Sequence, residues 1–103
     1  MSPINATDFI ARLESGEQMN LLDVREEIEY NTYNISGKNI PLPKLATAIN
    51  KLSYNKTDEI VVICTMGLRS ETARMLLIEN GYINARNLSG GLIALKKIDH
   101  KTH

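Results

Sequence analysis

Four consecutive apolar residues, Ile60 to Ile63, constrain the fold of this chain more than any other stretch. The run does not alternate between apolar and polar residues, which is typical of a strand buried on both faces of a parallel sheet. It ends at Cys64, and the six residues from Cys64 to Arg69 lead into a helical pattern. The sequence therefore predicts a buried strand, a tight loop and a helix N-terminus, with a thiol at the start of the loop.

Cys64 is the single cysteine of the chain and a candidate nucleophile. A loop that leads into a helix directs backbone N–H groups and the positive end of the helix dipole at one point, where they stabilise an anion. The pKa of a free cysteine is about 8.5, and a helix N-terminus with a nearby cation lowers it to roughly 3.5–7.5. The alternative is that Cys64 is an ordinary small apolar residue at the end of a strand. Gly67 and Arg69 in the same loop favour the nucleophile.

Short helices and short strands alternate along the rest of the chain. The first helix is expected between Asn5 or Thr7 as its cap and Gly16 as its stop, because apolar residues repeat at helical spacing at Ala6, Phe9, Ile10 and Leu13. Further helices are predicted at about residues 26–34, 44–52, 70–80 and 92–98, and further strands at 19–24, within 35–43 and at 83–88. This alternation predicts an α/β domain with a mostly parallel sheet of about five strands and helices on both faces. Ligands of such sheets bind beyond the carboxyl ends of the strands, where Cys64 is expected.

The composition narrows the class of protein. A chain of 103 residues is long enough for one domain with a single core. Its formal net charge of zero gives no reason to expect a nucleic acid or an anionic membrane as partner. One cysteine excludes an internal disulfide, and no metal site is expected, because His100 and His103 lie in a Lys-rich tail typical of a solvated terminus. Without a signal peptide pattern or a long apolar run, we expect a cytoplasmic protein.

Several motifs resemble those of the rhodanese family of sulfurtransferases, in the order of that family and over nearly the whole chain. The central one is the loop Cys64-x-x-Gly67-x-Arg69-Ser70. The others are Leu21-Leu22-Asp23-Val24-Arg25-Glu26 with Glu29-Tyr30, Asn34-Ile35-Ser36-Gly37 with Asn39-Ile40-Pro41, Asn80-Gly81-Tyr82, and Leu88-Ser89-Gly90-Gly91. The resemblance implies a doubly wound rhodanese-like fold, with residues 1–103 forming one domain.

The resemblance also implies a reaction. Cys64 takes a sulfane sulfur from thiosulfate or a low-molecular-weight persulfide and passes it to a thiol, cyanide or a sulfur-accepting protein. The resemblance implies three roles: Cys64 is the nucleophile, the N–H groups of its loop bind the persulfide, and further residues support the loop. The loop residues are Thr65, Met66, Gly67, Leu68 and Arg69, and the supporting residues are Asp23, Arg25, Glu29 and Ser70. No metal or organic cofactor is needed, because sulfur moves by thiolate chemistry.

Two supporting contacts are expected within this site. Arg25 and Glu29 are close enough in sequence to form an ion pair, either in the site wall or at the corner between a strand and a helix. Arg69 either orients an anionic donor or holds the loop closed through a carboxylate such as Glu71 or Glu29.

Two other functions remain open at this point. The chain is alternatively a rhodanese-like binding or sulfur-relay module, with Met66 and Leu68 on the loop rim facing a partner. Cysteine phosphatases also place a cysteine and an arginine at a helix N-terminus, but with five residues between them, and this loop has four. The sequence also departs from the rhodanese pattern, since Asn34 replaces a frequent histidine and Leu95 a frequent aromatic residue. Because Arg69 is the only cation in the loop, we expect a high KM for thiosulfate.

Overall fold

One parallel sheet forms the centre of the molecule. The computed structural model describes residues 2–101, with side chains through residue 98. Within these residues the sheet has four strands in the order β2-β1-β3-β4. The strands are β1 (Asn20–Asp23), β2 (Lys38–Asn39), β3 (Ile60–Ile63) and β4 (Ala85–Asn87). The predicted α/β class and parallel sheet are confirmed, with four strands in place of about five. Ile4 adds only an isolated bridge to Leu88 at the β4 edge, and one residue pair does not make a strand.

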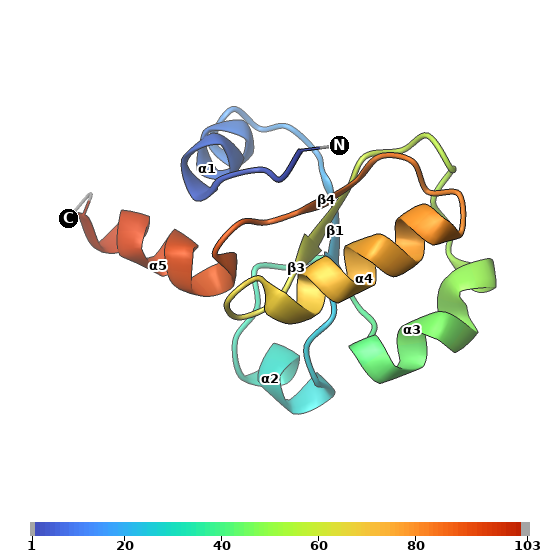
Figure 1. Cartoon of the computed structure of the whole chain (residues 1–103). Coiled ribbons are helices and arrows are strands. Elements are labelled where there is room, and N and C mark those ends of the chain that lie inside the picture. Colours follow the sequence, from blue (N-terminus) through green and yellow to red (C-terminus); the bar gives the residue numbers. More distant parts are fainter. Residues whose placement is uncertain (1, 102–103) are drawn as a thin grey trace.

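Helices cover both faces of the sheet (Figure 1). The helices are α1 (Ala6–Glu14), α2 (Glu27–Thr32), α3 (Leu42–Ala48), α4 (Leu68–Glu79) and α5 (Gly91–Lys101), with a 3₁₀ turn at Ile49–Lys51. Alternate residues of the strands face opposite sides: Leu21 packs with the cluster of α1 and α5, and Leu22 with the cluster of α3 and α4. The two cores therefore lie on either side of one sheet, as in a doubly wound fold.

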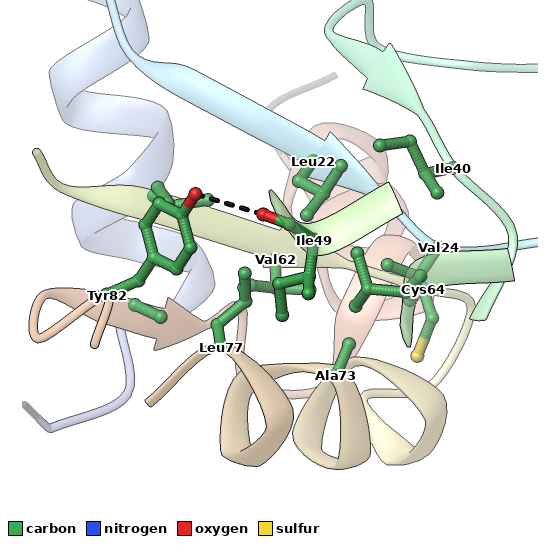
Figure 2. Packing of buried hydrophobic residues seen from close by; sticks show 12 residues of the cluster. Leu22, Val24, Ile40, Ile49, Val62, Cys64, Ala73, Leu77 and Tyr82 are labelled. Atoms are coloured by element: carbon green, nitrogen blue, oxygen red, sulfur yellow. Dashed lines mark hydrogen bonds between the residues drawn. The ribbon is translucent and has the colours of Figure 1, made fainter. Parts of the chain in front are cut away.

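The central strand matches its prediction residue for residue. All four residues of β3 are fully buried, because helices cover both of its faces. Figure 2 shows the core on the α3–α4 side, where Cys64 follows the strand and directs its sulfur to the side on which Ala73 of α4 lies. At the other end of this core the Tyr82 hydroxyl donates a hydrogen bond to the carbonyl of Ile49 (3.1 Å). The end of β3 that leads to Cys64 is thus continuous with the core.

Local signals explain most helix boundaries. The Asn5 side chain accepts a hydrogen bond from the Asp8 N–H (2.8 Å) and caps α1, and Gly16 follows the helix with a φ of 83°. Of the apolar residues at helical spacing, Ala6 and Phe9 form the buried side of α1, whereas Leu13 is 39 % exposed.

Two helices begin two residues earlier than the sequence predicts. Helix α3 begins at Leu42 instead of residue 44, because Pro43 lies in the first turn, where a missing backbone N–H breaks no hydrogen bond within the helix. Helix α4 begins at Leu68 instead of Ser70, because Gly67 adopts a φ of 94° and turns the chain directly into the helix. The second difference shortens the loop after Cys64 and brings the first turn of α4 close to the sulfur.

The described helices are all too short or too polar to cross a membrane. The expectation of a solvated tail at His100 and His103 concerns side chains outside the described residues.

Candidate active site

The sulfur of Cys64 lies at the N-terminus of α4. Cys64 directly follows β3, and Gly67 occupies the cap position before the helix. The first N–H groups of a helix have no partner within the helix. Two of these amides at the start of α4 donate hydrogen bonds to Sγ of Cys64, from Gly67 (3.1 Å) and from Ser70 (3.3 Å). The sulfur therefore takes the place of the side-chain oxygen that normally caps a helix.

This environment lowers the pKa of the Cys64 thiol below its ordinary value. Burial is the largest single influence and raises the pKa, because a thiolate is costly to desolvate. The Ser70 hydroxyl and the N–H groups of Ser70, Gly67 and Met66 lower the pKa, and together they outweigh burial. Hydrogen bonds to the anion thus favour the thiolate, the form of cysteine that acts as a nucleophile.

A hydrogen-bonded chain of side chains continues from the sulfur to β4. The Ser70 hydroxyl lies 3.2 Å from Sγ of Cys64 and 2.6 Å from Oδ1 of Asn87. The Asn87 amide nitrogen donates to the carbonyl of Gly67 (3.0 Å) and so holds the loop. Asn87 is absent from the residues that the sequence proposed for the site. Its position at the carboxyl end of a strand is a signal that could have identified it.

Helix α5 fixes the other side of the loop. Its N–H groups at Leu92 and Ile93 donate to the carbonyls of Cys64 (3.0 Å) and Thr65 (3.1 Å). This contact requires a glycine at position 91, because a Cβ there would lie 2.5 Å from both carbonyl oxygens. Gly91 also has a φ of 63°, which disfavours other residues. The Gly-Gly motif therefore shapes the loop from a distant part of the chain.

Arg69 is bound by Glu29 from α2. Its Nη1 lies 2.6 Å from Oε1 of Glu29, and its Nη2 lies 3.0 Å from Oε2. The Glu29 carboxylate thus binds both terminal nitrogens of the guanidinium. Nη2 also donates to Oγ1 of Thr65 (3.1 Å). The hydrogen bond from Arg69 is the main reason that the pKa of Glu29 falls to about 2. Of the two expected carboxylates, Glu29 is the one that Arg69 contacts, whereas Glu71 pairs with Arg74.

A cavity of about 370 Å³ opens beside the cysteine. Its lining combines the Arg69–Glu29 pair with the Cys64 sulfur and two exposed apolar side chains. These side chains are Met66, which is 57 % exposed, and Leu68, which is 72 % exposed. The complete lining is Glu29, Cys64, Thr65, Met66, Leu68 and Arg69. The cavity thus brings together most of the loop residues that the sequence proposed, together with Glu29.

Asp23 and Arg25 lie outside the lining of this cavity. They form a buried pair, with Nη2 of Arg25 2.8 Å from Oδ2 of Asp23, and Nη2 also donates to the carbonyl of Tyr33 (2.7 Å). The expected pairing of Arg25 with the Glu29 carboxylate is wrong, because Asp23 at the end of β1 is nearer and leaves only a long contact to the Glu29 carbonyl (3.5 Å). The pair joins β1 to the segment that follows it. Arg25 faces a neighbouring groove that shares Glu29 and Thr65 with the cysteine cavity.

Comparison with known proteins adds independent findings. A family model described as the Rhodanese-like domain matches residues 5–97. Human single-domain sulfurtransferase TSTD1 has a similar structure, with a TM-score of 0.79 and 28 % identity over 92 % of this chain and 95 % of that one.

Two curated relatives are similar over most of this chain. YrkF of Bacillus subtilis (strain 168), whose name marks it as a candidate sulfur carrier protein, is 37 % identical over 90 residues, covering 86 % of this chain and 48 % of that protein. MOCS3 of Arabidopsis thaliana, an adenylyltransferase and sulfurtransferase, is 32 % identical over 108 residues, covering 90 % of this chain and 23 % of that protein. The chain thus spans less than half the length of these curated relatives.

Proposed function

The chain belongs to the rhodanese-like domain family, and we propose that it is a sulfurtransferase that carries a sulfane sulfur as a persulfide on Cys64. The donor is thiosulfate or an organic persulfide, and the acceptor is a thiol, cyanide or a sulfur-accepting protein. The observation that carries the proposal is the set of hydrogen-bond donors around the cysteine sulfur at the carboxyl end of β3. We also propose that residues 1–103 act as one domain. The cytoplasmic location of the protein stays a prediction.

The first half-reaction loads the cysteine. The Cys64 thiolate attacks the outer sulfur of the donor, a new S–S bond forms, and the S–S bond of the donor breaks. Thiosulfate then leaves as sulfite, which takes the electron pair of the broken bond. An organic persulfide R–S–SH leaves as the thiolate R–S⁻, and the transferred sulfur keeps its proton on Cys64.

The second half-reaction regenerates the thiolate. The acceptor attacks the outer sulfur of the persulfide, and Cys64 leaves with the electron pair of the S–S bond. Cyanide becomes thiocyanate, whereas a thiol becomes a persulfide. The N–H groups of the loop, from Thr65 to Arg69, are proposed to bind the outer sulfur while it is carried. The positions of the Gly67 and Ser70 amides support this role, because they already donate to the cysteine sulfur.

A phosphatase is less well supported by the same geometry. Cysteine phosphatases use the arginine of the loop to bind a phosphate, but in this chain Glu29 occupies both guanidinium nitrogens that face it. Met66 and Leu68 at the rim are also apolar and exposed, so they offer a dianionic phosphate ester neither a hydrogen bond nor an opposite charge. These contacts favour sulfur transfer.

Intact mass spectrometry tests the proposal. Reduced protein is incubated separately with thiosulfate and with an organic persulfide, and the gain of one sulfur atom is measured before and after addition of cyanide. We expect a gain in the wild type that cyanide reverses, and no gain in Cys64→Ser, which has no other cysteine to react. No gain with either donor, in a protein whose Cys64 reacts with iodoacetamide, would overturn sulfur transfer.

A further inference from the structure

Glu29 cancels the positive charge of Arg69 in the cavity beside the cysteine. Both carboxylate oxygens bind the guanidinium, at 2.6 and 3.0 Å, and Thr65 accepts a third hydrogen bond from it. Arg69 is the single cation in the cavity lining and Glu29 the single carboxylate. When Cys64 is ionised, this lining therefore carries a net negative charge.

The carboxylate is itself held in place. Glu29 also accepts a hydrogen bond from the Glu26 N–H (3.0 Å) as part of the capping box of α2. Moving Glu29 away from Arg69 would therefore also break the cap of its own helix. The ion pair is a fixed part of the cavity, and an incoming anion meets the carboxylate as well as the guanidinium.

The rest of the cavity favours an uncharged organic group. Met66 and Leu68 lie on its rim and are more than half exposed. Contact with an organic substituent would remove part of this apolar surface from water. Thiosulfate offers no such group, and it carries its charge next to the sulfur that is transferred.

We propose that Glu29 is a specificity-determining residue that selects organic persulfides with an uncharged substituent over thiosulfate, by occupying Arg69 and placing a negative charge beside the entering sulfur. The inference rests on the proposed sulfurtransferase function and names its donor class. While Glu29 is present, Arg69 has no direct role in binding the donor.

The variant Glu29→Gln tests this assignment. Glutamine keeps the size and the hydrogen bond to the Glu26 N–H, but it has no charge and one acceptor oxygen, so it releases part of the guanidinium. The rate of persulfide formation on Cys64 is measured with thiosulfate and with N-acetylcysteamine persulfide, whose organic group is uncharged. We expect the ratio of kcat/KM for thiosulfate to that for the organic persulfide to rise about tenfold, mainly through a lower KM for thiosulfate, and to fall again at high salt.

Two further variants separate specificity from a structural effect. Glu27→Gln removes the same charge from the same helix, at a side chain that pairs with Lys44 and lies outside the cavity lining, and its ratio is expected to match the wild type. Glu29→Gln combined with Arg69→Gln is expected to lose the gain, because no guanidinium is left to bind the donor.

The outcomes are distinguishable. An unchanged ratio in Glu29→Gln, or an equal rise in Glu27→Gln, would overturn the role of Glu29 while sulfur transfer stands. A gain that persists without Arg69 would also overturn it. Failure of every donor to load sulfur onto wild-type Cys64 would overturn the proposed function itself.

Discussion

Replacing Ser70 with alanine removes the hydroxyl that lies 3.2 Å from the sulfur of Cys64 and leaves the backbone N–H of residue 70 in place. A hydrogen bond to a charged group contributes about 1.5–3 kcal/mol. Loss of that amount of thiolate stabilisation corresponds to a decrease of about tenfold to a hundredfold in the equilibrium constant for ionisation. The variant should therefore raise the pKa of Cys64 without removing the amides that also hold its sulfur.

The assay is the rate of alkylation of Cys64 by iodoacetamide as a function of pH. We expect the Ser70→Ala profile to move to higher pH. Its rate should be about tenfold to a hundredfold below that of the wild type in the acidic part of the profile, and the two rates should converge at high pH, where both thiols are ionised.

Ser89 provides the matched control for the Ser70 substitution. Ser89→Ala makes the same chemical change at an exposed side chain, and its profile should coincide with that of the wild type. If Ser70→Ala is folded and its profile also coincides with the wild type, the hydroxyl does not stabilise the thiolate. In that case the Ser70 hydroxyl donates its proton only to Oδ1 of Asn87 (2.6 Å), and the backbone amides alone lower the pKa of Cys64.

Three other substitutions test the framework of the site. Gly91→Ala places a Cβ 2.5 Å from the Thr65 carbonyl and should lower both the melting temperature and the alkylation rate of the cysteine. Asp23→Asn leaves Arg25 as a buried charge without its carboxylate and should lower the free energy of unfolding in urea by about 3–5 kcal/mol. Glu29→Gln should lower it by about 1 kcal/mol at neutral pH, a modest value because the pair is partly exposed. Because the pKa of Glu29 is about 2 and its ordinary value is 4.5, this difference should be complete above about pH 4.5 and shrink as the pH falls towards 2.

Each of these predictions has an opposite result. A melting temperature for Gly91→Ala equal to that of the wild type would mean that the loop relaxes without cost. An equally stable Asp23→Asn variant would show that the buried pair contributes no net stability. A stability difference for Glu29→Gln that stays constant down to pH 2 would show that the carboxylate is not stabilised by its ion pair.

Much of the fold follows from patterns within short stretches of sequence. The uninterrupted apolar run of β3 predicts a fully buried strand, because any polar residue on either face would lack water. Gly16 and one of the two proposed caps, Asn5, mark the ends of α1, and local sequence predicts such ends because caps and left-handed turns depend on neighbouring residues. Burial is less predictable, and Leu13 shows why: an apolar residue near the edge of a helical stripe is buried only if another element covers it, and Leu13 is 39 % exposed.

The candidate site also contains residues that local sequence predicts and residues that it does not. Cys64 at a strand end, followed by Gly67 and the first turn of a helix, was predictable because all of these groups lie within a few residues of one another. Ser70 reaches the sulfur for the same reason. Asn87 was not predicted, because it approaches Ser70 only when β4 lies beside β3 in the sheet.

By itself the sequence determined the class of fold, the loop that carries the cysteine and the family to which the chain is similar. Only the tertiary structure decided which groups surround that loop. Glu71 is two residues from Arg69 and Glu29 is 40 residues away, yet Arg69 binds Glu29. The physical reason is that an ion pair depends on the distance between charges in space, and that distance is set by where the fold places α2 and the start of α4 rather than by separation along the chain.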